Sequence, residues 1–155
     1  MSDRLNQYLQ ARNLTADESL GEGKDGYVWR TSRWTALKIH LTEESYQPER
    51  DAYIRLRDLG IDEVAGLRVP TLWEFDDACL AIEMSIVAPP YYVDFASAIF
   101  DSPPDFIEDE GNSFEDFIRH RFDERADDAL AFYFELAGRA GIYLPDIHRE
   151  NMKFA

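Results

Sequence analysis

The sequence predicts an α+β fold, in which a five-stranded antiparallel sheet with one helix is followed by a mainly helical half. Three observations predict this class. Strand-type runs flank a glycine-rich turn near Gly23, two further strand-type runs lie at 69–75 and 79–84, and helical periodicity returns from Ser113. With 155 residues, 45% of them hydrophobic, the chain is long enough for one domain with a buried core.

The charge balance excludes some partners. A formal net charge of −15 repels nucleic acid and anionic membrane surfaces, so neither is expected as a partner. The single cysteine, Cys79, cannot form an internal disulfide and fits a reducing compartment. No apolar run approaches the roughly 18–20 residues of a membrane span, and the N-terminus lacks a signal-peptide pattern. We therefore expect a cytoplasmic protein.

The first element expected is a helix over 2–13, because Leu5, Tyr8 and Leu9 fall at helical spacing after a possible N-cap at Ser2. A glycine-rich turn follows. It has the pattern G-x-G-x-x-G-x-V, formed by Gly21, Gly23, Gly26 and Val28. Because strand-type runs at 27–31 and 34–39 come next, we expect the glycines at the tip of a hairpin. Bare backbone N–H groups there can approach phosphates, although a flexible turn is the alternative.

Lys38 lies in the third strand among core-type residues, where an ammonium group is costly unless it has an anionic partner. The next helix is expected from Pro48, with Ala52, Tyr53 and Leu56 on its buried side. Glu49 falls on that side, so we predict that it pairs with Lys38. The alternative is that Glu49 is only a favourable charge in the first turn of the helix.

Gly60 is expected to end this helix, and the acidic turn 76–77 joins the strands at 69–75 and 79–84. Two prolines at 89–90 then stop any strand and suggest a hinge. We therefore divide the chain into a unit of residues 1–87 with a leading helix and a compact unit of residues 88–155.

Residues 91–112 are expected to be mostly irregular, with a short helix near 94–100. From Ser113, which with Asp116 resembles a capping box, a helical pattern continues to about Gly141. It is expected to break near Asp123. The run 129–134 is apolar nearly all round, which indicates burial on several sides.

The C-terminal residues contain Asp146 followed five positions later by Asn151, the spacing of a phosphotransferase catalytic loop. In such a loop the Asp takes or orients the proton of the attacking hydroxyl, and the Asn holds magnesium on the nucleotide phosphates.

With these parts in order, residues 20–154 resemble the protein-kinase-like superfamily, as its small lobe followed by the helical start of its large lobe. The resemblance implies ATP and magnesium as cofactors. It assigns phosphate binding to the glycine-rich turn and Lys38, and the role of partner of Lys38 to Glu49. It places a gatekeeper at Ile82 and, after it, the hinge that binds adenine, with Glu83 and Ser85. In the catalytic loop it assigns catalytic roles to Asp146 and His148 and metal binding to Asn151.

Two details refine the resemblance. The motif D-x-H-x-x-N is closest to small-molecule kinases such as aminoglycoside and choline kinases, and 144–145 replace the His-Arg of typical protein kinases. His148 has the alternative of packing or donating a hydrogen bond beneath the loop. The sequence ends four residues after Asn151, without the Asp-Phe-Gly segment that carries the principal metal-binding Asp, so we expect a weak or absent metal site.

Three functions follow from the resemblance. The favoured one is a pseudokinase-like ATP-binding module with little or no phosphoryl transfer. The others are an active phosphotransferase acting on a small molecule or protein, and an interaction domain that binds no nucleotide.

The helix at 126–141 carries apolar residues around much of its circumference; these are Leu130, Phe132, Tyr133, Phe134 and Leu136. A small lobe alone would leave part of this surface uncovered. We therefore expect a homodimer or a partner protein to cover the helix, unless residues 91–112 fold back over it.

Overall fold

The computed structural model describes residues 3–87, 92–105, 113–145, 147 and 152–153. The elements of the N-terminal unit are α1 Asp3–Arg12, β1 Ala16–Glu22, β2 Gly26–Thr31, β3 Thr35–His40, α2 Glu43–Asp58, β4 Glu63–Val64, β5 Leu67–Arg68, β6 Leu72–Asp76 and β7 Ala81–Ser85. Those that follow are β8 Tyr92–Val93, β9 Ile99–Phe100, α3 Phe114–Phe122, the 3-10 turn η1 Asp123–Arg125, α4 Ala126–Ala140, β10 Ile142–Tyr143 and β11 Met152–Lys153.

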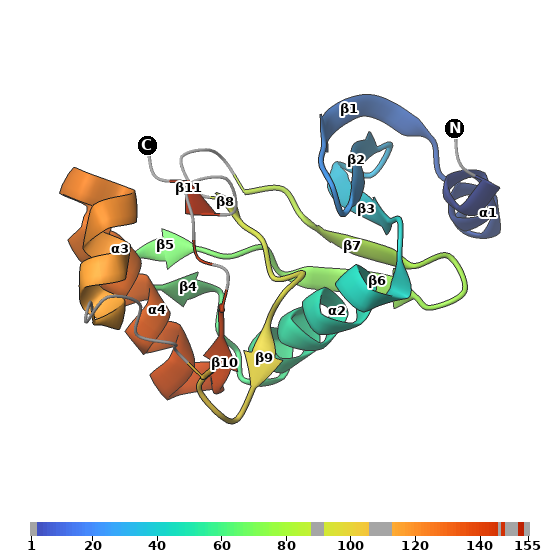
Figure 1. Ribbon diagram of the computed structural model, residues 1–155. Coiled ribbons are helices and arrows are strands. Elements are labelled where there is room, and N and C mark those ends of the chain that lie inside the picture. Colours follow the sequence, from blue (N-terminus) through green and yellow to red (C-terminus); the bar gives the residue numbers. More distant parts are fainter. Residues whose placement is uncertain (1–2, 88–91, 106–112, 146, 148–151, 154–155) are drawn as a thin grey trace.

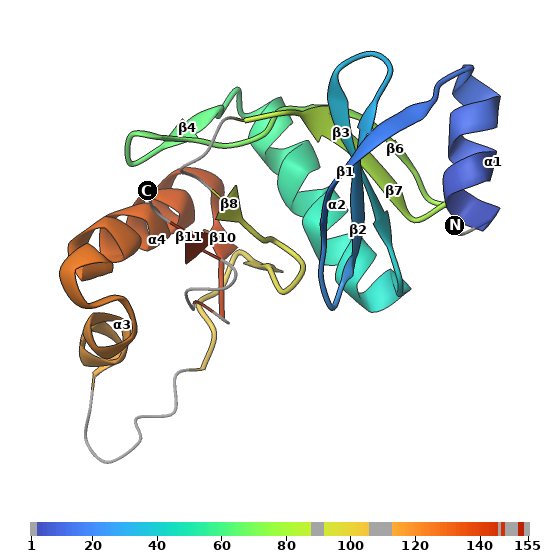
Figure 2. The same ribbon diagram turned by 90° about the horizontal axis from the view of Figure 1, so that it is seen from above.

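The predicted sheet is confirmed. Five strands pair antiparallel in the order β1-β2-β3-β7-β6, and α2 follows the third strand of the chain. Figures 1 and 2 show the sheet between α1 and α2, with α3 and α4 at the far end of the molecule from α1. The fold is therefore α+β, with a sheet unit followed by a helical unit.

Strand alternation explains why two helices cover the sheet. Leu37 and Ile39 of β3 are buried in one cluster with Leu5, Tyr8 and Leu9 of α1. Their neighbours in β3 point to the opposite face, since successive side chains of a strand alternate. On that face, Ala36 joins the larger core cluster, to which α2, α3 and α4 also contribute. The sheet is thus buried on both sides at β3.

Helix α2 begins five residues earlier than predicted. It starts at Glu43 after the N-cap Thr42, whose side chain accepts a hydrogen bond from the backbone N–H of Ser45, and it carries Pro48 within it. A Pro at the first helical position would have been ordinary, which is why Pro48 looked like the start. The signal for the true start was the Thr cap followed by acidic residues, since both favour a helix N-terminus.

The short helix expected near 94–100 is wrong. Residues 94–98 instead connect two short strands: β8, just before them, pairs antiparallel with β11, and β9, just after them, pairs antiparallel with β10. Each of these two strands consists of one aromatic and one β-branched residue, Tyr92 with Val93 and Phe100 with Ile99, and such residues favour strands. These pairings join the segment after the expected hinge to the C-terminal residues.

The helical region has the expected break and cap. In the capping box of α3, the side chain of Ser113 accepts from the N–H of Asp116, and that of Asp116 accepts from the N–H of Ser113. The break near Asp123 is also confirmed, because η1 separates α3 from α4. Helix α4 ends at Gly141, whose φ of 61° lies in the left-handed region that favours glycine.

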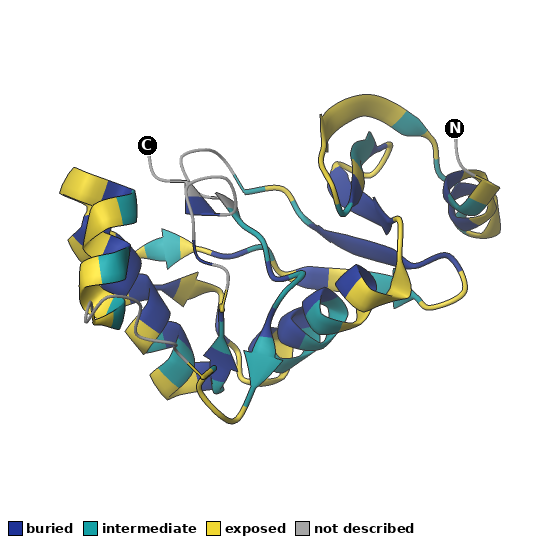
Figure 3. Cartoon of the chain, viewed as in Figure 1, coloured by how far each residue is buried: buried dark blue, intermediate teal, exposed yellow. Residues whose placement is uncertain are grey.

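The chain itself covers α4, which contradicts the expected uncovered helix. Leu130, Phe132, Tyr133 and Leu136 are all buried, in a cluster that includes Ile118 and Phe122 of α3; only Phe134 of the expected set is exposed, at 52%. In Figure 3 the buried residues of α3 and α4 face the rest of the molecule. The argument for a homodimer based on this helix therefore does not hold, and a dimer stays an untested prediction.

Among the residues that the structure describes, no helix has the length and apolar character that crossing a membrane requires.

Candidate functional site

The predicted ion pair between Lys38 and Glu49 is confirmed. Nζ of Lys38 in β3 lies 2.5 Å from Oε2 of Glu49 in α2, and the two residues are only 5% and 2% exposed. The sequence produces this contact locally, because Lys38 points to the α2 side of the sheet and Glu49 to the buried side of α2. Both charges are removed from water, so each depends on the other.

Lys38 lies in the middle of the sheet. It is opposite Val28 of β2 on one side and Ile82 of β7 on the other, and directly opposed residues of paired strands point to the same face. The turn of the β1–β2 hairpin, which carries the glycines, ends at Gly26, two residues before Val28. Gly26 is opposite His40 of β3. The structure thus brings Lys38, Glu49, Val28 and the glycine-rich hairpin together at one end of β2 and β3.

A second carboxylate, which the sequence analysis missed, reaches the same lysine. Oδ1 of Asp94 lies 3.6 Å from Nζ of Lys38, and the Asp94 side chain is 14% exposed. Residues 94–100 were expected to be helical, so no role was assigned to Asp94. The available signal was an Asp directly after the strand-type run Tyr91-Tyr92-Val93.

Burial raises the pKa of Glu49 to about 7; the positive charge of Lys38 lowers it, while the negative charges of Asp94 and Asp25 add to the increase. The pKa of His40 is shifted in the opposite direction. Burial and the nearby Lys38 lower the pKa of its imidazole to about 3, so that it is neutral near pH 7. Its Nδ1 lies 3.2 Å from Oγ of Ser45, and its Nε2 lies 3.3 Å from Oε2 of Glu49.

The three glycines of the hairpin differ in what requires them. A Cβ at Gly26 would lie 2.2 Å from the carbonyl oxygen of Ile39, so packing of β2 on β3 requires glycine there. A Cβ at Gly21 or Gly23 would have no neighbour within 4 Å, and neither has a positive φ. Side-chain packing within the described residues therefore does not explain Gly21 and Gly23. Gly21 lies at an irregularity of the β1–β2 register, and the N–H of Gly23 donates to the carbonyl of Gly26 at 2.9 Å across the turn.

Glu83 and Ser85, the residues expected to contact adenine, lie within the paired part of the sheet. Both residues belong to β7, which lies between β3 and β6. The N–H of Ser85 already donates to the carbonyl of Thr71 at 2.9 Å, so adenine would have to break that bond. The assignment of adenine binding to the backbone at Glu83 and Ser85 therefore stays a prediction, with this N–H already donating within the sheet.

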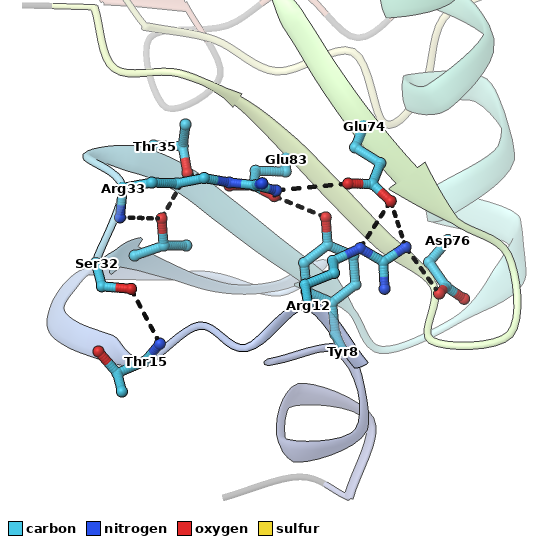
Figure 4. Close-up of polar contacts among 10 residues, drawn as sticks. Tyr8, Arg12, Thr15, Ser32, Arg33, Thr35, Glu74, Asp76 and Glu83 are labelled. Atoms are coloured by element: carbon cyan, nitrogen blue, oxygen red, sulfur yellow. Dashed lines mark hydrogen bonds and ion pairs between the residues drawn. The ribbon is translucent and has the colours of Figure 1, made fainter. Parts of the chain in front are cut away.

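The side chain of Glu83 points to the α1 face, away from Lys38, and is fully buried. Figure 4 shows its partners: Tyr8 of α1 donates to Oε2 at 2.7 Å, Nε of Arg33 donates to Oε1 at 2.7 Å, and Thr35 also donates to Oε1. Burial alone would raise the pKa of Glu83, but the hydrogen bonds from these three donors hold it below its ordinary value. The Glu83 carboxylate therefore fastens α1 to the sheet.

The catalytic-loop residues predicted from the sequence, Asp146, His148 and Asn151, lie outside the described residues. Around them, Leu144, Ile147 and Met152 are buried, and the carbonyl of Ile147 accepts a hydrogen bond from Arg121 at 3.2 Å. Within the described part of the chain, no three His, Cys, Asp or Glu side chains are grouped so that they could hold a metal ion.

A hollow of about 630 Å³ lies elsewhere, between α2, β9 and the C-terminal end of α4. It is lined by Asp51, Ile54, Arg55, Asp58, Leu59, Phe100 and Ala140. None of these residues contacts the Lys38–Glu49 pair in the described interactions, and the hollow is open rather than enclosed. We therefore place the candidate site at Lys38, where buried charge and the glycines coincide.

Comparison of the chain with known protein families found no matching family, and comparison with curated proteins found no match.

Proposed function

We propose that the chain binds ATP on the α2 face of the sheet, beneath the hairpin at 21–26, as a kinase-like nucleotide-binding module. The observation that carries the proposal is the buried pair of Lys38 and Glu49, 2.5 Å apart, in the middle of a five-stranded antiparallel sheet. Lys38 would bind phosphate oxygens, Val28 and Ile82 would line the site, and Gly21 and Gly23 would let backbone N–H groups approach the phosphates.

A purely structural role is a weaker explanation for the buried Lys38–Glu49 pair than ligand binding. A buried ion pair costs desolvation energy, and well-packed apolar residues of similar volume often give equal or greater stability. A lysine in the centre of a sheet, paired with a carboxylate whose pKa is raised to about 7, is thus a candidate for function.

The catalytic loop enters the proposal from the sequence alone. Asp146 would orient an acceptor hydroxyl, His148 would support the loop, and Asn151 would hold magnesium, which when bound neutralises phosphate charge. The carboxylate and amide oxygens of Asp146, Asn151 and Asp94 are donors of the kind that magnesium prefers. The active phosphotransferase remains the second candidate, and the presence of Asp94 beside Lys38 is the observation that favours it.

The test of ATP binding is calorimetry with ATP on the wild type and Lys38→Met. The wild type should bind ATP, and the variant should bind at least about tenfold more weakly because a charged contact to phosphate is lost. Arg57→Met is the matched control, since Arg57 is exposed and paired only with its neighbour Asp58 in the described contacts. A wild type that binds no ATP at millimolar concentration would favour the interaction-domain alternative.

A further inference from the structure

Helix α1 is fixed to the sheet through an apolar cluster of its own. Its buried residues pack with residues of β3, of the β6–β7 turn and of β7; the members are Leu5, Tyr8, Leu9, Leu37, Ile39, Cys79 and Ala81. Within the described residues, none of these belongs to the larger cluster, which α2, α3 and α4 share. Figure 2 shows α1 at the opposite end of the molecule from α4. The larger core therefore does not depend on α1.

The polar contacts beneath α1 share a second cation, Arg33, which belongs to the turn between β2 and β3. Glu83 accepts a hydrogen bond from Tyr8 of α1, and it is also paired with Arg33. Glu74 pairs with Arg12 of α1 at 2.6 Å and lies 3.4 Å from the same Arg33 (Figure 4). Glu83 and Glu74 thus each have a cationic partner that does not belong to α1.

This arrangement lowers the cost of detaching α1. Removing one partner of a buried ion pair is strongly destabilising, because it leaves a buried charge uncompensated. When α1 leaves, the carboxylate of Glu83 keeps the guanidinium of Arg33 and the hydroxyl of Thr35. Tyr8 and Arg12 pass into water, which satisfies their hydrogen-bonding groups. The sheet side of the contact is therefore complete without α1.

The connection between α1 and β1 contains a hinge position. Asn13 follows α1 with a φ of 54°, in the left-handed region that Asn tolerates better than most residues. Two residues later, Thr15 is fixed to the β2–β3 turn. Its carbonyl accepts from the N–H of Ser32 at 3.0 Å, and its own N–H donates to Oγ of Ser32 at 3.2 Å. Rotation at residues 13–14 therefore moves α1 while β1 stays in the sheet.

We propose that α1 is a latch that leaves the sheet as a unit while the rest of the fold stays intact. Proteins open locally in such cooperative units, with free energies below that of global unfolding. Opening uncovers Cys79 and also Leu37 and Ile39, which flank Lys38 in β3. The latch thus lies behind the strand that carries the candidate site. The inference does not depend on nucleotide binding.

The rate at which Cys79 reacts with an aromatic disulfide reagent measures the opening, because Cys79 is 1% exposed while α1 is docked. It is the single cysteine of the chain, so the signal has one source. At low urea, the opening free energy from this rate should fall with a slope well below the global m-value, because opening one helix exposes little surface. Tyr8→Phe should raise the rate without urea at least about tenfold, since it removes a hydrogen bond to a charged group.

Ile118→Val is the control, because Ile118 is fully buried in the larger cluster and the change destabilises the molecule as a whole. It should leave the labelling rate of Cys79 without urea unchanged. A slope equal to the global m-value, or equal acceleration by both variants, would show that Cys79 is reached only through global unfolding and would overturn the inference. A rate that Tyr8→Phe does not change would assign the exposure to the β6–β7 turn alone, and the latch would again be wrong.

Hydrogen exchange followed by mass spectrometry gives a second measurement that does not use the thiol. The amides of α1 should exchange at least about tenfold faster in Tyr8→Phe than in the wild type, whereas those of α2 should exchange equally in both. Acceleration of both helices, or of neither, would contradict the opening of α1 as a separate unit.

Discussion

At the scale of single residues, two buried groups beside Lys38 oppose each other in their response to pH. The pKa of His40 falls to about 3 from an ordinary 6.5, so between these values the unfolded chain holds a proton that the folded chain lacks. Stability from this group therefore rises with pH over that window. The pKa of Glu49 rises to about 7 from an ordinary 4.5, so the folded chain holds the extra proton and stability falls as pH rises.

The first prediction concerns His40→Gln. Between pH 4.5 and 6.5 the two wild-type effects oppose each other, so their sum should be nearly flat. Removing the imidazole leaves the effect of Glu49, so the free energy of unfolding of the variant should increase as pH falls from 6.5 to 4.5. The difference in slope is about 1.4 kcal/mol per pH unit for one proton. Urea unfolding at several pH values measures it, with the exposed His120→Gln as control; parallel curves for His40→Gln and wild type would contradict the assignment.

At the scale of elements, the attachment of α1 depends on a polar contact as well as on apolar packing. Tyr8 and Glu83 are both fully buried, and their hydrogen bond joins α1 to β7. Nearby, Arg12 of α1 pairs with Glu74 at 2.6 Å and with Asp76 at 3.2 Å, both in β6 (Figure 4). Burial and the carboxylate of Glu83 raise the pKa of the Tyr8 phenol above its ordinary value, so Tyr8 remains a donor across the physiological range.

The second prediction is that Tyr8→Phe lowers the free energy of unfolding by about 1.5–3 kcal/mol, the range for a hydrogen bond to a charged group. The ring and its packing remain, so the loss reports the missing hydroxyl. Tyr27→Phe is the control, because Tyr27 is 40% exposed, and a surface change of this kind is usually worth less than about 0.5 kcal/mol. Equal small losses in the two variants would show that Arg33 and Thr35 satisfy Glu83 without Tyr8.

At the scale of the whole molecule, the helical unit and the sheet unit share one core. The largest cluster of buried residues includes Tyr53 of α2, Ile82 of β7, Ile118 of α3 and Phe132 of α4. Arg55 of α2 also reaches the C-terminal end of α4, where it donates to the carbonyl of Ala140 at 3.2 Å. The two expected units therefore fold as a single packed body within the described residues.

The third prediction uses two phenylalanines of α4 as matched probes. Phe132 is fully buried in the shared core and Phe134 is 52% exposed. Phe132→Ala should cost about 3–5 kcal/mol of unfolding free energy, whereas Phe134→Ala should cost about 1 kcal/mol or less. Light scattering on the wild type and Phe134→Glu tests assembly in the same experiment. A wild-type dimer that Phe134→Glu dissociates would mean that the exposed part of α4 contacts a second copy after all.

Much of the sheet unit could be predicted from the sequence. Alternation placed Lys38 inside a strand, helical spacing placed Glu49 on the buried side of α2, and glycines marked the hairpin between β1 and β2. These features depend on the local periods of strand and helix, which short stretches of sequence already contain. The start of α2 was missed because Pro48 gave a local signal that competed with the Thr42 cap.

By itself, the sequence determined the α+β class, the order of the main strands and helices and the Lys38–Glu49 pair. Only the tertiary structure decided which distant segments meet. It placed Asp94 beside Lys38, turned Glu83 toward α1 and covered α4 with α3. The physical reason is that periodicity determines which side of an element is buried, whereas the partner on that side depends on long-range packing and strand pairing. Those contacts join residues far apart in the chain, where no local pattern records them.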